Sequence, residues 1–213
     1  MHFLPYVEIH TTLTSQPRFN NALKIQNKLN NSLIVQGING TNAFYTFSRL
    51  NVLISEKYYG GVKYINWGKL GKWASILNVL DKTNNQIAVI IEDDIKFNDD
   101  TWSKLLNYIN NVKDWKIEPP FTRASPYNEC LLINGYNKTI FMNTVIKNGI
   151  DNPLDIFSYK YKLQKRLPFS FNVRGYKSEL LNSNYRGNSL IEIEYANNII
   201  KKLSKTKFLH DTL

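Results

Sequence analysis

The sequence is poor in the residues that coordinate zinc or carry out thiol chemistry. It contains one cysteine, Cys130, and three histidines among 213 residues. One cysteine cannot form an internal disulfide, so nothing here requires an oxidising compartment. Cys130 begins an apolar stretch that runs to Ile133, and we interpret it as a small buried residue. Two of the histidines lie near the chain ends, which leaves little support for a histidine-based triad.

Several short catalytic motifs are missing as well. The pattern GxxxxGKS/T is absent, which speaks against a P-loop that holds phosphates. There is no CxxC or HExxH pair, so a zinc site is not expected. There is also no GxSxG turn of the kind that carries a nucleophilic serine.

Long apolar runs are absent too. No segment approaches the roughly 18 consecutive apolar residues that a membrane-spanning helix needs. The N-terminus lacks a basic region followed by a long apolar stretch, so we expect no signal peptide. We therefore predict a cytoplasmic protein without a transmembrane segment, located in the host cytoplasm if it is viral. Attachment to the periphery of a membrane is the alternative.

Positive charge, in contrast, is in excess. The chain has 27 Lys and Arg against 17 Asp and Glu, which gives a net charge of +10. Such a charge attracts anions in general, including nucleic acid, acidic membranes, charged glycans and nucleotide-sugars. The basic residues cluster only mildly, at residues 160–166 and 201–207, and we interpret both clusters as solvated faces.

The spacing of apolar residues predicts an α/β fold. Leu70, Trp73 and Leu77 follow the period of a helix with one buried face, and Leu23, Ile25 and their neighbours do the same in an earlier segment. Alternating helices and short strands predict a mostly parallel, Rossmann-like central sheet flanked by helices, in a single domain over residues 1–213. The predicted helices cover residues 17–31, 68–80, 102–112, 137–148 and 192–203, and the strands cover 6–10, 32–36, 87–91 and 129–134; residues 43–56 are left unassigned.

The strongest chemical signal is an acidic triplet after an apolar strand. The run 87–91 is apolar on both faces, as in a buried central strand, and Glu92, Asp93 and Asp94 follow it directly. Ligands of open α/β sheets bind outside the carboxyl ends of the strands. Adjacent carboxylates repel one another unless a cation is present, and Mg²⁺ or Mn²⁺ prefers carboxylate and phosphate oxygens. We predict that Asp94 and Glu92 bind such a metal. The alternative is a solvated acidic turn ahead of a helix that Asp99 and Asp100 cap.

With this triplet in view, the chain resembles glycosyltransferase family 25, which holds bacterial lipooligosaccharide galactosyltransferases and collagen galactosyltransferases. The resemblance covers roughly residues 6–158, and its most specific part is the triplet with its upstream helix. Two departures are Ile76, where the family usually has histidine, and the segment 9–12, where it usually has asparagine and leucine. Four blocks carry the resemblance, in the family's order: the strand 6–10 with Arg18, the turn Gly37-Ile38-Asn39-Gly40, the helix Gly68-Lys69-Leu70-Gly71 with Ser75 followed by Ile91-Glu92-Asp93-Asp94, and the segment 131–155.

The resemblance implies a fold of the GT-A type, a UDP-sugar donor, a divalent cation and an inverting displacement. It suggests a distant member of viral or phage origin. An inverting enzyme needs a carboxylate that accepts the proton of the acceptor hydroxyl. Asp155 is our candidate for this base, with Asp151 as the second choice, although either could instead cap a helix. The remaining candidates for contacts with the donor are Thr11, Thr12, Arg18, Lys72, Ser75, Glu92 and Asp93.

Three rival functions remain open at this point. Transfer of a sugar to modified bases of DNA would keep the chemistry and use the positive charge. A non-enzymatic nucleic-acid-binding protein would use the many Tyr and Phe residues for stacking, but it gives no reason for the acidic triplet. A metal-dependent nucleotidyltransferase would also place carboxylates at a strand end, and it would release pyrophosphate instead of UDP. The favoured acceptors are a glycan, a lipid-linked saccharide or a protein.

Overall fold

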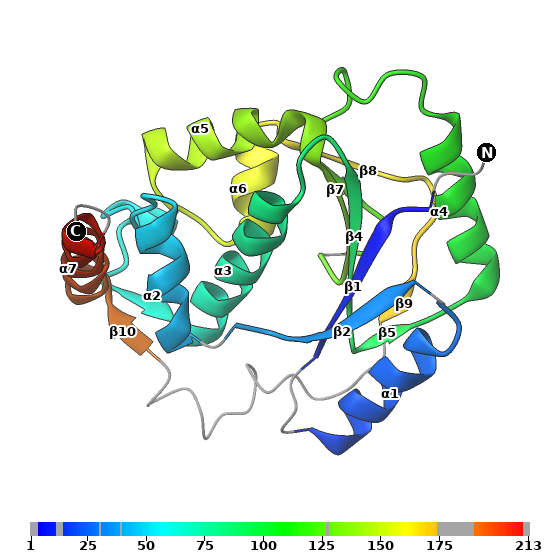
Figure 1. Ribbon diagram of the computed structural model, residues 1–213, viewed down its shortest axis with the longest axis horizontal. Coiled ribbons are helices and arrows are strands. Elements are labelled where there is room, and N and C mark those ends of the chain that lie inside the picture. Colours follow the sequence, from blue (N-terminus) through cyan, green and yellow to red (C-terminus); the bar gives the residue numbers. More distant parts are fainter. Residues whose placement is uncertain are drawn as a thin grey trace. The chain divides into compact units, whose positions relative to one another are not determined.

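The apolar run 87–91 forms the middle of a sheet in the computed structural model (Figure 1). It belongs to β4 (Ile87–Glu92), in which the first five residues are buried and Glu92 is half-buried. β-Branched residues favour an extended backbone, and a strand covered on both faces needs no polar alternation. β4 pairs on one side with β1 (Tyr6–Thr11) and on the other with β7 (Cys130–Asn134). The predicted buried central strand is therefore confirmed.

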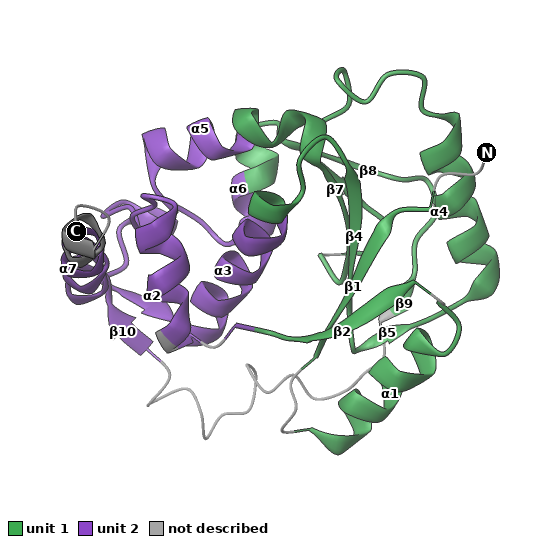
Figure 2. Ribbon diagram, in the orientation of Figure 1, with its two compact units in different colours: residues 1–37, 80–140, 158–176 green, residues 38–79, 141–157, 177–213 purple. Residues whose placement is uncertain are grey.

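The structure describes residues 4–11, 15–29, 31–38, 40–126, 128–173 and 190–210. The fold divides into two compact units, although the composition of the chain carries no sign of a boundary (Figure 2). The first unit is built from residues 1–37, 80–140 and 158–176, and the second from residues 38–79, 141–157 and 177–213. Each unit thus takes three separate stretches of the chain.

The first unit contains a six-stranded sheet with the order β2-β1-β4-β7-β6-β8. The α/β class is confirmed, but the sheet is mixed where we expected a mostly parallel one. β7 runs antiparallel to both of its neighbours, whereas the other pairs are parallel. The short connection 124–129 explains why β6 and β7 are antiparallel, because parallel neighbours need a long crossover. The strands not yet bounded are β2 (Ser32–Gln36), β6 (Phe121–Arg123) and β8 (Gln164–Arg166).

Two helices, α1 (Gln16–Gln26) and α4 (Asp99–Asn111), pack against one apolar layer of this sheet. The first helix ends before the predicted residue 31, and Leu23 on it is 38% exposed, so its predicted place on the apolar side is wrong. The packed residues of this layer include Val7, Ile9, Val89 and Ile91 from the strands, Ala22 and Ile25 from α1, and Leu105 and Ile109 from α4. A short pair of strands, β5 (Ile95–Lys96) and β9 (Asn172–Val173), adds Ile95 to the same core.

The start of α4 corrects the predicted cap. Asn98 is the N-cap residue, and its side chain accepts a hydrogen bond of 3.0 Å from the backbone N–H of Thr101. Asp99 and Asp100 lie in the first turn, so they follow the cap instead of forming it. Their negative charge is still favourable there, because the N-terminus of a helix carries a partial positive charge.

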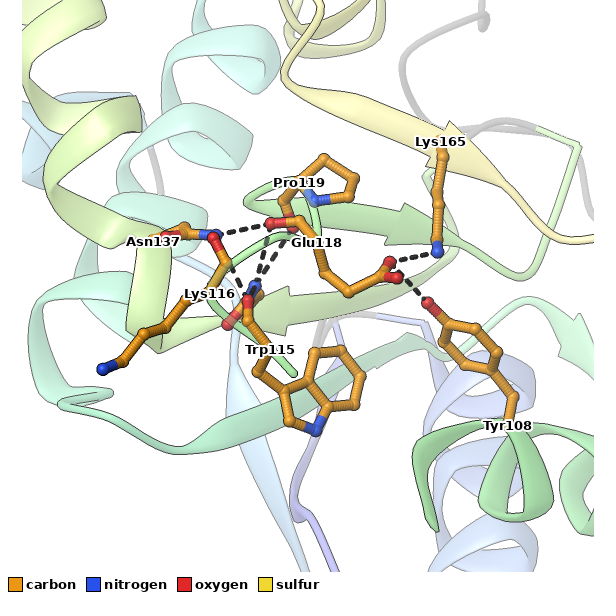
Figure 3. A network of polar contacts seen from close by, with 8 residues as sticks. Tyr108, Trp115, Lys116, Glu118, Pro119, Asn137 and Lys165 are labelled. Carbon is orange, nitrogen blue, oxygen red and sulfur yellow. Dashed lines mark hydrogen bonds and ion pairs between the residues drawn. The ribbon is translucent and has the colours of Figure 1, made fainter. Parts of the chain in front are cut away.

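A network of polar contacts fixes the loop between α4 and β6 (Figure 3). The amide of Asn134 donates to the carbonyl oxygens of Trp115 at 2.7 Å and Glu118 at 3.1 Å. Asn137, in the short 3-10 turn Gly135–Asn137, donates to carbonyls of the same loop. The Glu118 carboxylate forms an ion pair with Lys165 of β8 and accepts a hydrogen bond of 2.9 Å from Tyr108 of α4. These contacts join α4, the loop and β8 around the end of β7.

The second unit is mostly helical. Its helices, some of which extend into the first unit, are α2 (Gly40–Arg49), α3 (Trp67–Lys82), α5 (Lys138–Asn148), α6 (Leu154–Lys160) and α7 (Ile193–His210), and its strands are β3 (Tyr64–Asn66) and β10 (Leu190–Glu192). The predicted helices at 68–80, 137–148 and 192–203 are confirmed, and α2 fills much of the segment left unassigned. Trp73 is 1% exposed and lies against the rings of Phe141 and Phe157.

Three further expectations bear on this architecture. Cys130 is fully buried, as predicted, and burial raises the pKa of its thiol, so the thiolate is disfavoured. Gly149 closes α5 with a φ of +67°, the left-handed conformation that glycine adopts without strain. None of the helices in the described ranges has the length and apolar character that crossing a bilayer requires.

Candidate functional site

The acidic triplet lies where two parallel strands of the first unit end. β1 and β4 are neighbours, and His10 is paired in register with Glu92. The chain turns directly after Glu92, because Asp93 and Asp94 are in a turn before β5. The backbone N–H of Glu92 donates to the carbonyl of Glu129 at 2.6 Å, and that of Asp93 donates to the carbonyl of His10 at 3.0 Å. The turn is therefore held from both neighbouring strands.

Asp93 is the buried member of the triplet. Its side chain is 1% exposed and contacts Arg18, whose Nε and Nη2 lie 2.7 and 2.5 Å from Oδ1. Thr11 at the end of β1 donates to Oδ2 of the same carboxylate at 2.7 Å. The amide of Asn21, one helical turn after Arg18, donates to the carbonyls of Asp93 and Ile95. Both oxygens of Asp93 thus serve to fasten α1 and β1 to the turn.

Asp94 is more open than Asp93 and less well satisfied. Its side chain is 20% exposed, and its Oδ2 lies 3.6 Å from Nη2 of Arg18. Its Oδ1 is buried and has no hydrogen-bond partner among the described residues. Burial raises the pKa of Asp94 to about 6, and the negative charge of Glu92 adds to this, while Arg18 opposes it. The carboxyl group of Asp94 therefore lies near other negative charges, whose effect on its pKa Arg18 opposes.

Glu92 is half-buried beside it, and Glu129 at the start of β7 is 8% exposed. In the described part of the chain, no three side chains of His, Cys, Asp or Glu are arranged to hold a metal ion. Glu92 and Asp94 supply two carboxylates, which fits the way Mg²⁺ is commonly held, by one or two carboxylates together with substrate phosphates. A divalent cation would thus fit this donor set only if a ligand completed the coordination.

The other candidates lie in the second unit or outside the described residues. Ser75 on α3 is 7% exposed, and its hydroxyl accepts a hydrogen bond of 3.0 Å from the backbone N–H of Ile38, which gives it a structural contact. Lys72, on the same helix, is half-buried. Asp151 is 5% exposed and accepts a hydrogen bond of 3.0 Å from the side chain of Asn152. Asp155 lies in the first turn of α6 and is half-buried. Thr12 falls outside the described residues.

The structure therefore brings together Thr11, Arg18, Asp93 and Asp94, with Glu92 next to them. The other described candidates belong to the second unit: Lys72, Ser75, Asp151 and Asp155. The structure also adds residues that sequence reasoning missed. The position of Asn21, three residues after Arg18, is a signal that could have identified it, because such residues share one face of a helix. No sequence pattern could have identified Glu129, because it lies near Glu92 only through the pairing of β7 with β4.

A second buried carboxylate lies on β1 itself. Glu8 is 2% exposed and accepts hydrogen bonds of 2.8 Å from Tyr6 and His10, two residues away on either side. Residues at that spacing share one face of a strand. The contact with Glu8 gives His10 a structural partner within β1.

No protein-family model and no curated protein matches this chain.

Proposed function

We propose that this chain is a metal-dependent glycosyltransferase of the GT-A type, related to family 25. It would transfer galactose or glucose from a UDP-sugar to a hydroxyl group of a glycan, a lipid-linked saccharide or a protein. A cytoplasmic site of action, in a host cell if the chain is viral, belongs to the same proposal and rests on sequence patterns alone.

The observation that carries the proposal is that Asp93 and Asp94 have different contacts within the acidic turn. Asp93 is buried and bound to Arg18 and Thr11, which fixes the backbone of the turn. Asp94, in contrast, keeps a buried carboxylate oxygen outside this clamp, and the half-buried Glu92 lies next to it at the carboxyl end of β4. A merely structural acidic turn has no use for a buried, unpaired carboxylate oxygen, since that oxygen costs desolvation free energy.

In this proposal Asp94 and Glu92 hold Mn²⁺ or Mg²⁺, which when bound neutralises charge on the diphosphate of the donor. Arg18 and Thr11, first considered as donor contacts, take a positioning role because both are committed to Asp93. Arg18 also limits the repulsion inside the triplet, since its guanidinium lies beside both aspartates. The chain thereby presents a rigid, negatively charged corner to a cation before any donor arrives.

The proton acceptor of the transfer is proposed on the resemblance. Asp155 keeps the role of base and Asp151 that of the alternative. Asp155 is half-buried in the first turn of α6 whereas Asp151 is only 5% exposed, so the carboxylate of Asp155 is the more accessible of the two to an acceptor. Replacing Asp155 with alanine should leave UDP binding intact and reduce the rate of transfer, by a factor of about 10² to 10⁴ if a general base is lost.

The test is isothermal titration calorimetry with UDP in the presence of Mn²⁺. The native chain should bind UDP only with the metal, and Asp94→Asn should abolish that binding because it removes a ligand charge while keeping the shape of the side chain. Asp100→Asn is the matched control, since Asp100 is 71% exposed and forms an ion pair with Lys104 on the surface of α4.

Circular dichroism and urea unfolding of both variants ensure that a loss of binding is not a loss of fold. Equal UDP affinity in the native chain and in Asp94→Asn would defeat the metal site. If the chain releases pyrophosphate from a nucleoside triphosphate, and no UDP from a UDP-sugar, it is a nucleotidyltransferase and the proposed function is wrong.

A further inference from the structure

Helix α7 presents a basic face that the proposed activity does not use. Three of its lysines are exposed, and together with an aromatic and two other side chains they line a groove of about 410 Å³. The lining residues are Tyr195, Asn198, Ile199, Lys201, Lys202 and Lys205. Glu194 is exposed next to Tyr195 in the sequence but does not line the groove, so the lining contains only positive charge.

The opposite face of α7 anchors the helix within the second unit. Ala196 is fully buried and Ile200 is 1% exposed, and these residues follow the three-to-four spacing of a packed helix face. The side chain of Asn197 exchanges two hydrogen bonds with the backbone of Ile54, at 2.9 and 2.7 Å. Ser204 contacts Ser48 of α2 at 3.1 Å. α7 lies beside α2 (Figure 1), and its buried residues Ala196 and Ile200 occupy its apolar side within the second unit.

This face contains an aromatic and an aliphatic side chain besides its lysines, which a merely solvated row of charges does not need. Lysines near the C-terminal half of a helix are favourable for the helix dipole, and that alone would explain their positions. It does not explain Tyr195, which is 60% exposed, or Ile199, which is half-buried on the same groove. Aromatic and aliphatic groups flanked by lysines are typical of surfaces that meet the headgroup layer of a membrane, where a ring contacts the acyl boundary and ammonium groups contact phosphates.

We propose that this lysine face of α7 binds the anionic headgroups of a membrane surface. Lys201, Lys202 and Lys205 lie within about 6 Å along the helix axis, a compact footprint that matches clustered lipid phosphates. A nucleic-acid backbone, in contrast, is usually followed by a longer basic track with arginine. The contact is peripheral, because α7 already buries its apolar side inside the second unit.

The test is co-sedimentation of the full chain with vesicles of phosphatidylcholine alone or with about 30% phosphatidylserine. We expect binding to the anionic vesicles only, and weaker binding as salt rises. The triple variant Lys201→Glu, Lys202→Glu, Lys205→Glu should lose about a hundredfold or more of this affinity, since each juxtamembrane lysine contributes roughly a factor of five. Tyr195→Ser should weaken binding to the same vesicles without any change in charge.

The matched control is the triple variant Lys24→Glu, Lys113→Glu, Lys116→Glu, which changes net charge equally at three exposed lysines of the first unit. Retained vesicle binding in this control, with loss in the α7 variant, is the expected result. Equal loss in both variants, or no binding of the native chain to anionic vesicles, overturns the proposal. Binding to single- or double-stranded DNA but not to vesicles, lost in the α7 variant, also overturns it and assigns the face to nucleic acid. None of these outcomes depends on UDP or Mn²⁺, so the result is independent of the proposed activity.

Discussion

At the residue scale, the contact between Asp93 and Arg18 decides whether the acidic turn keeps its shape. Both groups are largely withdrawn from water, with Asp93 1% and Arg18 14% exposed. Removing one partner of a buried ion pair leaves the other charge uncompensated, which typically costs about 3–5 kcal/mol. Within the triplet, the carboxylate of Asp93 therefore has a structural role.

The first prediction follows from this pair. Asp93→Asn should lower the free energy of unfolding by about 3 kcal/mol, because Arg18 would then face a neutral amide and the nearby Asp94 alone. Urea unfolding followed by fluorescence measures the change, and Asp100→Asn, on the exposed surface of α4, should stay within about 0.5 kcal/mol of the native chain. A loss below about 1 kcal/mol in Asp93→Asn would show that the ion pair contributes little.

For Tyr58 we predict a substitution that raises the free energy of unfolding. Its side chain is 2% exposed, its hydroxyl has no hydrogen-bond partner among the described residues, and burial raises its pKa. A buried hydroxyl without a partner costs free energy, so Tyr58→Phe should stabilise the fold by about 1 kcal/mol. Thermal unfolding of the two proteins measures this. Destabilisation by the same change would mean that the hydroxyl is bonded in solution.

Glu8 predicts how stability depends on pH. Burial acts to raise the pKa of this carboxyl, but hydrogen bonds from His10 and Tyr6 outweigh it and the pKa lies below its ordinary value. A lowered folded-state pKa stabilises the fold above the unfolded value of about 4.3, and this contribution disappears as the pH falls through the folded pKa. Glu8→Gln should therefore be less stable than the native chain at pH 7, with a difference that shrinks toward pH 3. Urea unfolding across that range tests it, and a difference that stays constant would contradict it.

At the scale of elements, the sequence allowed the regular parts of the fold to be predicted and left their pairing open. β4 and α3 were predictable because five adjacent apolar residues, or apolar residues every three to four positions, leave one way to bury them. The direction of β7 was not, since an apolar run reads the same for parallel and antiparallel pairing. Leu23 shows a further limit, because helical spacing marks a face of α1 without saying how far the sheet extends beneath it.

In the candidate site, too, local features could be predicted from the sequence but contacts between distant residues could not. The triplet was identified from its own neighbourhood in the chain, and Arg18 from the family resemblance. Their contact joins residues 75 positions apart, and no local pattern reports such a distance. Asp93 was therefore grouped with donor-binding residues, whereas its surroundings make it the anchor of the turn. Glu129 was missed for the same reason.

The polar contacts that hold the loop between α4 and β6 (Figure 3) give a prediction at the scale of elements. Asn134 is fully buried, donates to the carbonyls of Trp115 and Glu118, and accepts from the backbone N–H of Tyr136 at 3.2 Å. Asn134→Ala leaves these backbone groups without their partner, and we expect a loss of about 2–4 kcal/mol in unfolding free energy. Asn110→Ala is the control, because Asn110 is exposed and its amide donates to the carbonyl of Leu106 within α4. Urea unfolding measures both, and similar losses would show that burial of Asn134 does not matter.

At the scale of the whole molecule, the net charge of +10 raises the question of how a basic protein carries an acidic site. The charges are segregated: α7 gathers lysines on one exposed face of the second unit, and the triplet gathers carboxylates at a sheet end of the first. Under the proposed function, long-range attraction would bring anions such as nucleotide-sugars toward the chain, while the local field at Asp94 and Glu92 would select cations. A diphosphate and a divalent cation are thus expected to bind together or not at all.

This coupling gives the last prediction, which concerns the stability of the whole chain. A ligand that binds only the native state adds about 2.7 kcal/mol at one hundred times its dissociation constant. For a chain of this size that corresponds to a rise of roughly 5–10 °C in melting temperature. UDP with Mn²⁺ should produce this rise, UDP with EDTA should not, and Asp94→Asn should respond to neither. Screening UDP-, GDP-, CMP- and TDP-sugars in the same assay then ranks the donors. A rise with UDP that persists in EDTA would place the nucleotide somewhere other than a metal held by the acidic turn.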